Sequence, residues 1–233
     1  MLGHSLIAPA LAGCALLLLS MCIAVSGLGS PAEVGSETWL FDSIDKIGGH
    51  PTTVLGHPRV IDSPVGKAVE FNGEDDALQL DVHPLAGAST FTWEAIFRPD
   101  GGNEEQRWFH LEENPATGSD ANTRMLFEIR VIDSRWCLDA FNRSGTVQKA
   151  LIDRKHLHTL SEWHRVAAVY DGSEFRSYVD GVLDEKAEIT FKSQGAGRTS
   201  IGSRMNKVYY FKGAIHMARF TRRALPPSEF IKL

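Results

Sequence analysis

The chain has 233 residues, of which 43% are hydrophobic and 23% are charged, an ordinary balance for a globular protein. Its net charge is −5 and no basic cluster stands out, which argues against nucleic acid and an anionic membrane surface as partners. One domain of about 200 residues is common among β-sandwiches and β-barrels, so a single domain is expected.

Residues 1–30 contain no Asp, Glu, Lys or Arg. An apolar stretch centred on Ala15–Leu19 reaches Val25, and the small residues Ala24 and Ser26 form an A-x-S step at its end. This pattern predicts a signal peptide over residues 1–26 and a linker over 27–37, so the protein is expected to be secreted or periplasmic.

Two alternatives stay open for this segment. Residues 6–25 are long enough to span a bilayer, so an uncleaved N-terminal anchor is the one membrane attachment that the sequence offers. Leu11-Ala12-Gly13-Cys14 matches the lipobox of bacterial lipoproteins, although the apolar core follows this cysteine instead of preceding it. All three interpretations place the globular part outside the cytoplasm.

Short runs of strand-forming residues follow one another over residues 38–233, with a turn-rich segment over 42–66. A single helix is predicted, a short one capped by Ser228 after Pro226-Pro227. Strands are expected at 38–41, 68–71, 77–82, 90–98, 125–132, 136–141, 166–170, 175–179, 211–215 and 217–221.

Two Asp-Gly pairs, Asp171-Gly172 and Asp180-Gly181, flank a run of only seven residues. Asp-Gly between apolar runs is a strong hairpin signal, because a tight reversal needs positive φ. The preceding run, 166–170, is apolar at both its even-numbered and its odd-numbered positions, as expected for a strand that is buried on two sides. Many short strands with frequent turns predict an all-β, two-sheet antiparallel sandwich of the jelly-roll kind.

An ordered series of segments resembles the laminin-G-like jelly rolls of the concanavalin A-like lectin/glucanase superfamily. The series comprises 64–73 (PVGKAVEFNG), 91–95 (FTWEA), 163–172 (WHRVAAVYDG), 178–181 (YVDG), 201–202 (IG), 211–215 (FKGAI) and 224–225 (AL). The resemblance covers residues 38–233 and implies two curved antiparallel sheets. That architecture hosts lectins, glycosidases, lyases and adhesion modules, so function has to be argued from a site.

Metal and thiol chemistry finds little support in the sequence. Cys14 and Cys22 fall in the leader, and Cys137 alone cannot form an internal disulfide or a cysteine zinc site. We expect Cys137 to be a small buried apolar residue. His156 and His158 could face the same way on a strand, but no third ligand lies near them in the sequence, so no metal site is predicted.

The resemblance also implies a calcium site, because relatives often hold calcium near the chain termini with oxygen ligands. Where that pattern has an acidic residue after Gly213-Ala214-Ile215, this chain has His216. This departure disfavours calcium, and no other cofactor is expected.

Catalytic motifs are equally sparse. The E-x-D-x-x-E spacing of the related glucanases does not occur. Residues 124–130 and 210–213 faintly resemble strand motifs of alginate lyases. The resemblance would give Arg130 the role of neutralising a uronate carboxylate and Tyr210 a role in proton transfer, but the lyase Gln-x-His element is not found. No catalytic residue is therefore assigned.

Sugar binding needs aromatic planes beside hydrogen-bonding side chains. Phe127, Ile129 and Val131 should be buried, which turns Glu128 and Arg130 toward a groove or solvent. Trp93 and Trp163 are expected in the core. The candidate ligand-binding residues are Glu128, Arg130 and Trp136, together with the rim segment that contains Arg107, Trp108 and His110.

The sequence thus predicts an exported, non-catalytic carbohydrate- or surface-binding module whose partner is an oligo- or polysaccharide. One alternative is a glycan-acting hydrolase or polysaccharide lyase with diverged motifs. The other is a structural protein-adhesion domain.

Overall fold

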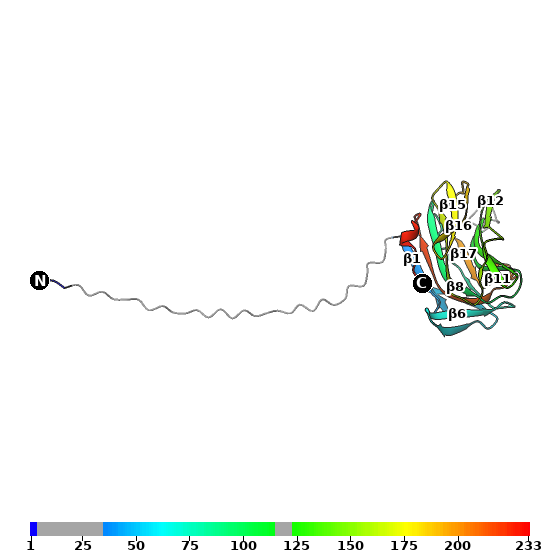
Figure 1. Cartoon of the computed structure of the whole chain (residues 1–233), viewed down its shortest axis with the longest axis horizontal. Helices are drawn as coiled ribbons and strands as arrows, with labels where there is room; N and C mark the ends of the chain where they lie inside the picture. Colours follow the sequence, from blue (N-terminus) through cyan, green and yellow to red (C-terminus); the bar gives the residue numbers. More distant parts are fainter. Residues whose placement is uncertain (4–34, 115–122) are drawn as a thin grey trace. The chain divides into compact units, whose positions relative to one another are not determined.

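A computed structural model describes residues 1–3, 35–114 and 123–233 (Figure 1). Residues 35–114 and 123–233 belong to one compact unit. The predicted signal peptide, with its anchor and lipobox alternatives, falls almost wholly in residues 4–34 and so lies outside the described residues. Among the residues that are described, no helix has the length and apolar character needed to cross a membrane.

The first sheet has eight antiparallel strands in the order β16-β15-β14-β8-β18-β6-β5, and β1 also pairs with β18. Its strands are β1 Ser36–Leu40, β5 Arg59–Ser63, β6 Gly66–Asn72, β8 Phe91–Pro99, β14 His164–Tyr170, β15 Glu174–Val179, β16 Val182–Glu188 and β18 Lys212–Thr221.

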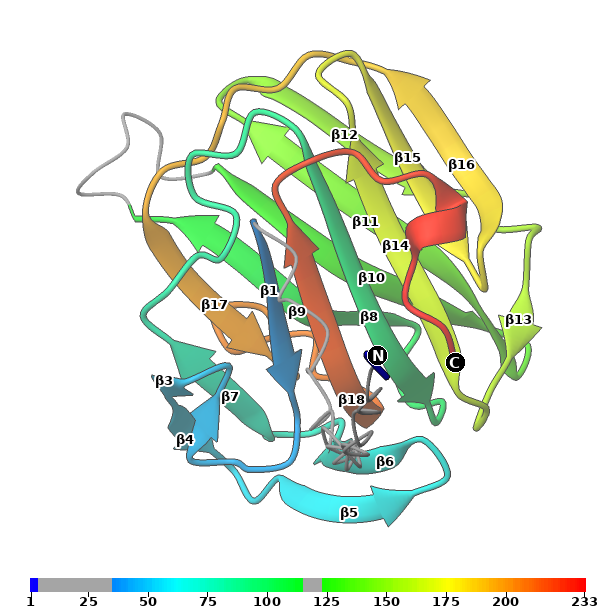
Figure 2. The same ribbon diagram turned by 90° about the vertical axis from the view of Figure 1, so that its left-hand side faces the viewer.

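The second sheet, also antiparallel and of eight strands, runs β12-β11-β10-β9-β17-β7-β4, and β13 pairs with β11. Its strands are β4 Thr53–Leu55, β7 Ala77–Leu80, β9 Glu105–Glu113, β10 Arg124–Ile132, β11 Arg135–Ser144, β12 Val147–Ile152, β13 His158–Thr159 and β17 Gly197–Ile201. A separate two-stranded ribbon joins β2 Lys46–Ile47 to β3 His50–Pro51. Figure 2 shows the two sheets as stacked layers, which confirms the predicted antiparallel sandwich.

Aromatic side chains from both sheets form the core between them. Phe97 of β8 stacks on Trp108 of β9 with ring centroids 4.3 Å apart. Trp93 of β8 lies 4.1 Å from Phe127 of β10 by the same measure. All four side chains are at most 1% exposed, so these contacts fix how the strands of the two layers face each other.

The doubled hairpin is confirmed. β14 pairs with β15 after Asp171-Gly172, and β15 pairs with β16 across Asp180-Gly181. Asp180 has φ 52° and Gly181 has φ 84°, the positive values that a tight two-residue reversal requires.

The predicted two-sided burial of β14 is confirmed as well. Val166 and Ala168 pack into the main core, while Ala167 and Val169 pack under Phe230 of the C-terminal segment. That segment crosses the outer face of β14 and β15 in Figure 2.

Three local expectations differ from the structure. The turn-rich segment 42–66 contains the short strands β2–β5. The predicted helix is a single 3-10 turn, Pro227–Glu229, in which Pro226 is the N-cap and Ser228 lies inside the turn. Trp163 is only half-buried and is not a core residue, because its ring lies at the surface beneath Arg98, whose guanidinium is 5.5 Å from the ring centroid.

Candidate binding site

A β-bulge in β9 decides which side chains reach the outer face of the second sheet. Phe127 pairs with Phe109 but Glu128 pairs with Arg107, so Trp108 is the extra residue. Both Trp108 and Phe109 therefore point into the core. Arg107 lies on the outer face, opposite Glu128.

The alternation of β10 and β11 places acidic and basic groups on this face. Glu128 and Arg130 lie on the side of β10 opposite to Phe127 and Ile129, as predicted, and Glu128 pairs across the strands with Asp139 of β11. Arg130 Nη2 lies 3.1 Å from Glu128 Oε2 and 2.6 Å from Asp139 Oδ2. Arg107 Nε completes the network 3.1 Å from Glu128 Oε1.

This network is buried more deeply than the sequence predicted. Glu128 is 5% exposed and Arg130 is 8% exposed, although both line a surface depression. They form its floor and not an exposed pair. Removing one member of this floor would be costly, because another charge would stay buried without its partner.

The depression has a volume of about 230 Å³. Its lining is rich in arginine and also contains apolar surface: Arg107, Arg124, Glu128, Arg130, Asp139, Phe141, Ala150 and Arg204. Arg204 forms no ion pair with any carboxylate in the described part of the chain. The lining holds four arginines and two acidic groups, and Arg107 also pairs with Glu105 at 3.2 Å, so Arg204 is the positive charge of the lining that no described carboxylate offsets by an ion pair.

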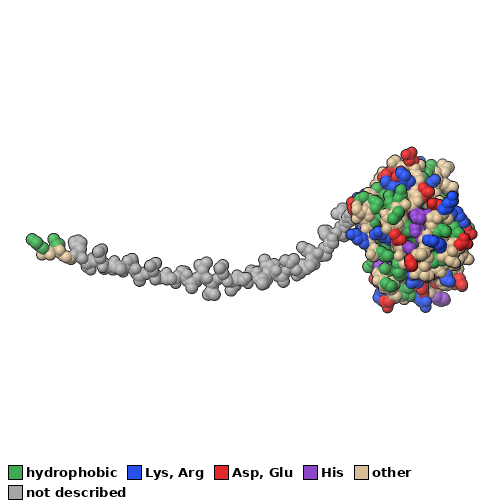
Figure 3. All heavy atoms as spheres, viewed as in Figure 1, with side chains coloured by type: hydrophobic (Ala, Val, Ile, Leu, Met, Phe, Trp, Pro, Cys, Tyr) green, Lys and Arg blue, Asp and Glu red, His purple; other side chains and the backbone are tan. Residues whose placement is uncertain are grey.

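On the face shown in Figure 3, basic and acidic side chains are interspersed. A larger depression of about 440 Å³ lies beside β6, but its lining sets three acidic residues, Glu70, Asp76 and Asp100, against Arg59 and Lys212, and Arg59 is paired with Glu70 at 2.5 Å. We therefore regard the depression beside Arg204 as the better candidate for an anionic ligand.

Asp139 has an unusual environment within the floor. Burial and the neighbouring charge of Glu128 raise its pKa to about 6. No described residue donates a hydrogen bond to its Oδ1, while Oδ2 is held by Arg130. Asp139 therefore changes charge near neutral pH, and sequence analysis missed it because only the strand register brings it beside Glu128.

The two candidate tryptophans are buried in the core, whereas a sugar-binding site needs aromatic rings that a ligand can reach. Trp108 and Trp136 are both 0% exposed and belong to the core, so neither ring can stack on a ligand in this structure. The bulge turns Trp108 inward, and Trp136 is fixed by a hydrogen bond from its Nε1 to the carbonyl oxygen of Thr159, at 2.8 Å.

Two other aromatic rings, Phe141 and Tyr209, lie at or beside the depression. Phe141 lines the depression, and the Arg124 guanidinium lies 5.1 Å from its centroid. Tyr209 is 41% exposed and stacks against Arg107, with the guanidinium 3.6 Å from the ring centroid. Tyr209 lies in a loop, where strand periodicity gives no signal.

His110 lies close to the depression but is only 1% exposed. Its Nδ1 accepts a hydrogen bond of 2.9 Å from the backbone N–H of Met205, in the loop that carries Arg204 and Tyr209. Burial, followed by the positive charge of Arg124, lowers the pKa of His110 well below its ordinary value. His110 is therefore neutral near pH 7 and holds the loop in place.

The cysteine and three histidines that the sequence analysis considered lie outside the depression. Cys137 is fully buried as expected, and burial raises the pKa of its thiol to about 11. His216 Nδ1 lies 2.7 Å from the carbonyl oxygen of Lys67. His156 and His158, which have no third ligand near them in the sequence, meet Asp184 of β16.

A family model described as the concanavalin A-like lectin/glucanases superfamily matches residues 72–230. Domain 4 of AbnA, an extracellular GH43 arabinanase from Geobacillus stearothermophilus solved in complex with arabinotriose, is 17% identical with a TM-score of 0.62. That match covers 83% of this chain and 94% of the AbnA domain chain.

Two further solved structures share the fold. The binding domain of Paraclostridial Mosquitocidal Protein 1 is 14% identical with a TM-score of 0.59, over 84% of this chain and 51% of the other. NanB sialidase from Streptococcus pneumoniae is 16% identical with a TM-score of 0.54, over 69% of this chain and 26% of the sialidase. A comparison with curated proteins found no match. Identities this low show the shared fold, and any ligand has to be argued from the depression itself.

Proposed function

Because the chain belongs to the concanavalin A-like lectin/glucanase superfamily, we propose that it is a non-catalytic carbohydrate-binding module for an acidic oligosaccharide. The ligand would occupy the arginine-lined depression on the outer face of β9, β10 and β11. The observation that carries the proposal is Arg204, which lines this depression and has no ion-pair partner among the described residues.

The chemistry of the lining supports an anionic sugar. A guanidinium presents a planar fork of N–H donors that matches a carboxylate, and such charge-assisted hydrogen bonds are stronger than neutral ones. Arg204 lines the depression and presents this kind of donor. Phe141 and Tyr209 add aromatic surface beside these donors, the combination expected where a sugar ring is bound.

The solved relatives support the carbohydrate class in a general way. The AbnA domain was solved in complex with arabinotriose, and another relative is a toxin binding domain. Neither bears on an acidic ligand, which we infer from the charge of the lining alone.

A panel of oligosaccharides tests the proposal. Trigalacturonate and other oligo-uronides should bind the immobilised domain, while neutral oligosaccharides of the same length should bind at least about tenfold more weakly, because their hydroxyl groups form only weaker hydrogen bonds to the Arg204 guanidinium than a carboxylate does. Equal binding of neutral and acidic sugars would contradict the acidic ligand. Binding of no sugar at all would contradict the carbohydrate function and leave the adhesion alternative.

A hydrolase remains the second candidate, because of Asp139. A carboxyl group with a pKa near 6 beside the carboxylate of Glu128 is the pairing of acid and base that glycoside cleavage uses. Both carboxylates contact Arg130, however, which ties up oxygens that a reaction would need. Release of reducing ends or unsaturated products from an oligo-uronide would favour an enzyme, and binding without any product would favour the module.

Export to the outside of the cytoplasm is part of the same proposal. It rests on the uncharged apolar segment within residues 1–26. Mass spectrometry should find a mature chain that begins near Gly27, whereas a soluble cytoplasmic protein with intact Met1 would contradict export.

A further inference from the structure

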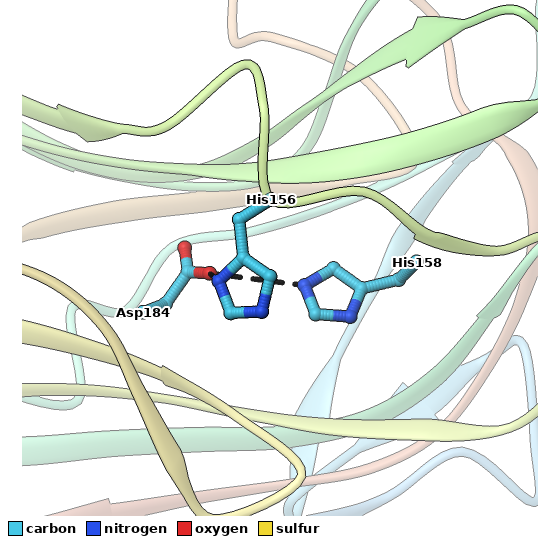
Figure 4. A group of neighbouring side chains, drawn as sticks. All are labelled: His156, His158 and Asp184. Atoms are coloured by element: carbon cyan, nitrogen blue, oxygen red, sulfur yellow. Dashed lines mark ion pairs between the residues drawn. The ribbon is translucent and has the colours of Figure 1, made fainter.

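Two histidines and one aspartate converge where the edges of the two sheets approach each other. His156 lies in the turn after β12, His158 begins β13 of the second sheet, and Asp184 lies on β16, the edge strand of the first sheet. One ligand atom from each residue lies within 4.8 Å of the others. Figure 4 shows the Asp184 carboxylate pointing at ring nitrogens of both histidines.

The distances are close to those of a metal site. His156 Nδ1 lies 2.7 Å from Asp184 Oδ1, and His158 Nε2 lies 3.7 Å from the same oxygen. Ligand atoms bound tetrahedrally to zinc are about 3.4 Å apart, since the zinc–ligand bonds are about 2.0–2.2 Å long. The two measured separations are within about 0.7 Å of that value, and the ligand nitrogens of the two histidines lie within 4.8 Å of each other.

The polar atoms of this cluster are also unsatisfied. The Asp184 side chain is only 1% exposed, yet neither of its oxygens accepts a hydrogen bond from the residues that the structure describes. The contact with His156 is an ion pair by distance, but its direction is not that of a hydrogen bond. His158 Nε2 is likewise buried without a hydrogen-bond partner among the described residues. A buried carboxylate is costly unless a cation compensates it.

The surroundings hold His158 and leave His156 accessible. The His158 ring packs against Trp136, with centroids 4.9 Å apart, and the Trp136 Nε1–H is tied to the carbonyl of Thr159. The His156 side chain is 42% exposed, which gives an ion a route from solvent. One fixed histidine, one buried carboxylate and one accessible histidine suit capture of an ion at the surface.

We propose that His156, His158 and Asp184 form a site for a divalent transition metal of the zinc type. Two imidazole nitrogens and one carboxylate oxygen suit zinc, cobalt or nickel, whereas calcium and magnesium prefer oxygen ligands alone. Three protein ligands leave a coordination position for water. Because the ligands come from both sheets, the bound ion clips β16 of the first sheet to the β12–β13 edge of the second.

Metal titration of the tag-free full chain, first freed of metal with a chelator, tests the site. One equivalent of Zn²⁺ should bind, and free Zn²⁺ at 100 times Kd should raise Tm by about 5–10 °C, because the ion binds the folded state. Co²⁺ in place of Zn²⁺ should show visible absorption bands of a site with nitrogen ligands, which report coordination directly.

Variants separate this site from casual binding at surface histidines. His156→Gln changes an exposed residue and should fold normally, but it should weaken Zn²⁺ binding at least about tenfold and abolish the Tm shift. Asp184→Asn, which keeps the side-chain shape, should do the same. His57→Gln, at an exposed histidine outside the cluster, should bind like wild type. The proposal is overturned if wild type binds no Zn²⁺ at about 1 mM, or if binding survives His156→Gln unchanged.

Discussion

Arg130 Nη2 lies 2.6 Å from Asp139 Oδ2 and 3.1 Å from Glu128 Oε2, so one guanidinium nitrogen serves two carboxylates. All three residues are at most 8% exposed. The outer face of β10 and β11 therefore has a floor of mutually dependent charges, above which Arg204 and Tyr209 provide the groups that remain open to a ligand.

Removing the shared guanidinium should destabilise the domain. Arg130→Ala leaves Glu128 and Asp139 buried without their common partner, which typically costs about 3–5 kcal/mol. Urea denaturation should show this loss. Arg59→Ala, which breaks an ion pair whose arginine is exposed, should cost about 1 kcal/mol or less. Equal, small effects of both substitutions would show that the floor does not depend on Arg130.

The raised pKa of Asp139 predicts a pH dependence of stability. A carboxyl group whose pKa rises from 3.8 to about 6 on folding contributes stability below pH 3.8, and that contribution is lost as the pH rises through about 6. Asp139→Asn stays neutral at every pH. It should therefore gain stability relative to wild type between pH 4 and pH 7, by an amount of the order of 2–3 kcal/mol.

Chemical denaturation of both proteins at pH 4, 5, 6 and 7 measures that difference. A difference that stays constant across the series would contradict a raised pKa of Asp139.

Protonation of Asp139 should also strengthen ligand binding. Below its pKa of about 6 the floor loses one negative charge, while a uronate remains ionised at pH 5. The affinity for an oligo-uronide should therefore rise between pH 7.5 and pH 5 in wild type. Asp139→Asn should show a much flatter profile in the same titration, and identical profiles for the two proteins would rule out this coupling.

The reversal at Asp180-Gly181 gives a prediction about the fold. Gly181 has φ 84°, and a Cβ at this position would lie 2.8 Å from Arg165 Nη2. Gly181→Ala should therefore destabilise the domain by about 1–2 kcal/mol and lower Tm by several degrees.

Gly195→Ala is the matched control for that substitution. Gly195 does not need a positive φ, and its new Cβ would meet only the flexible end of the Glu113 side chain. Thermal denaturation should show a much smaller change, and a Tm loss as large as that of Gly181→Ala would argue against the special role of the turn.

The strands and hairpins were predictable because their signals are local. The alternation of Phe127, Glu128, Ile129 and Arg130 gave the two faces of β10, and Asp180-Gly181 gave the reversal. The orientation of Trp108 was not predictable in this way, because the β9 bulge breaks the period of two and turns two consecutive aromatic residues inward.

The candidate sites depend on contacts between distant segments. Asp139 reaches Glu128 through the register of β10 and β11, and Arg204 reaches the depression through the fold of a loop. Asp184 meets His156 only because β16 of the other sheet lies beside the β12 edge. A single sequence carries no signal for such pairings, so the residue types could be identified but not their partners.

Calorimetric titration with an oligo-uronide, comparing wild type with Arg204→Gln, tests the proposed function most directly. The loss of one charge-assisted hydrogen bond should weaken binding about 10–100-fold, while Arg204, which has no ion-pair partner among the described residues, should be dispensable for folding. Arg59→Gln, outside the depression, should bind like wild type. If Arg204→Gln binds the oligo-uronide as tightly as wild type does, the depression is not the ligand site.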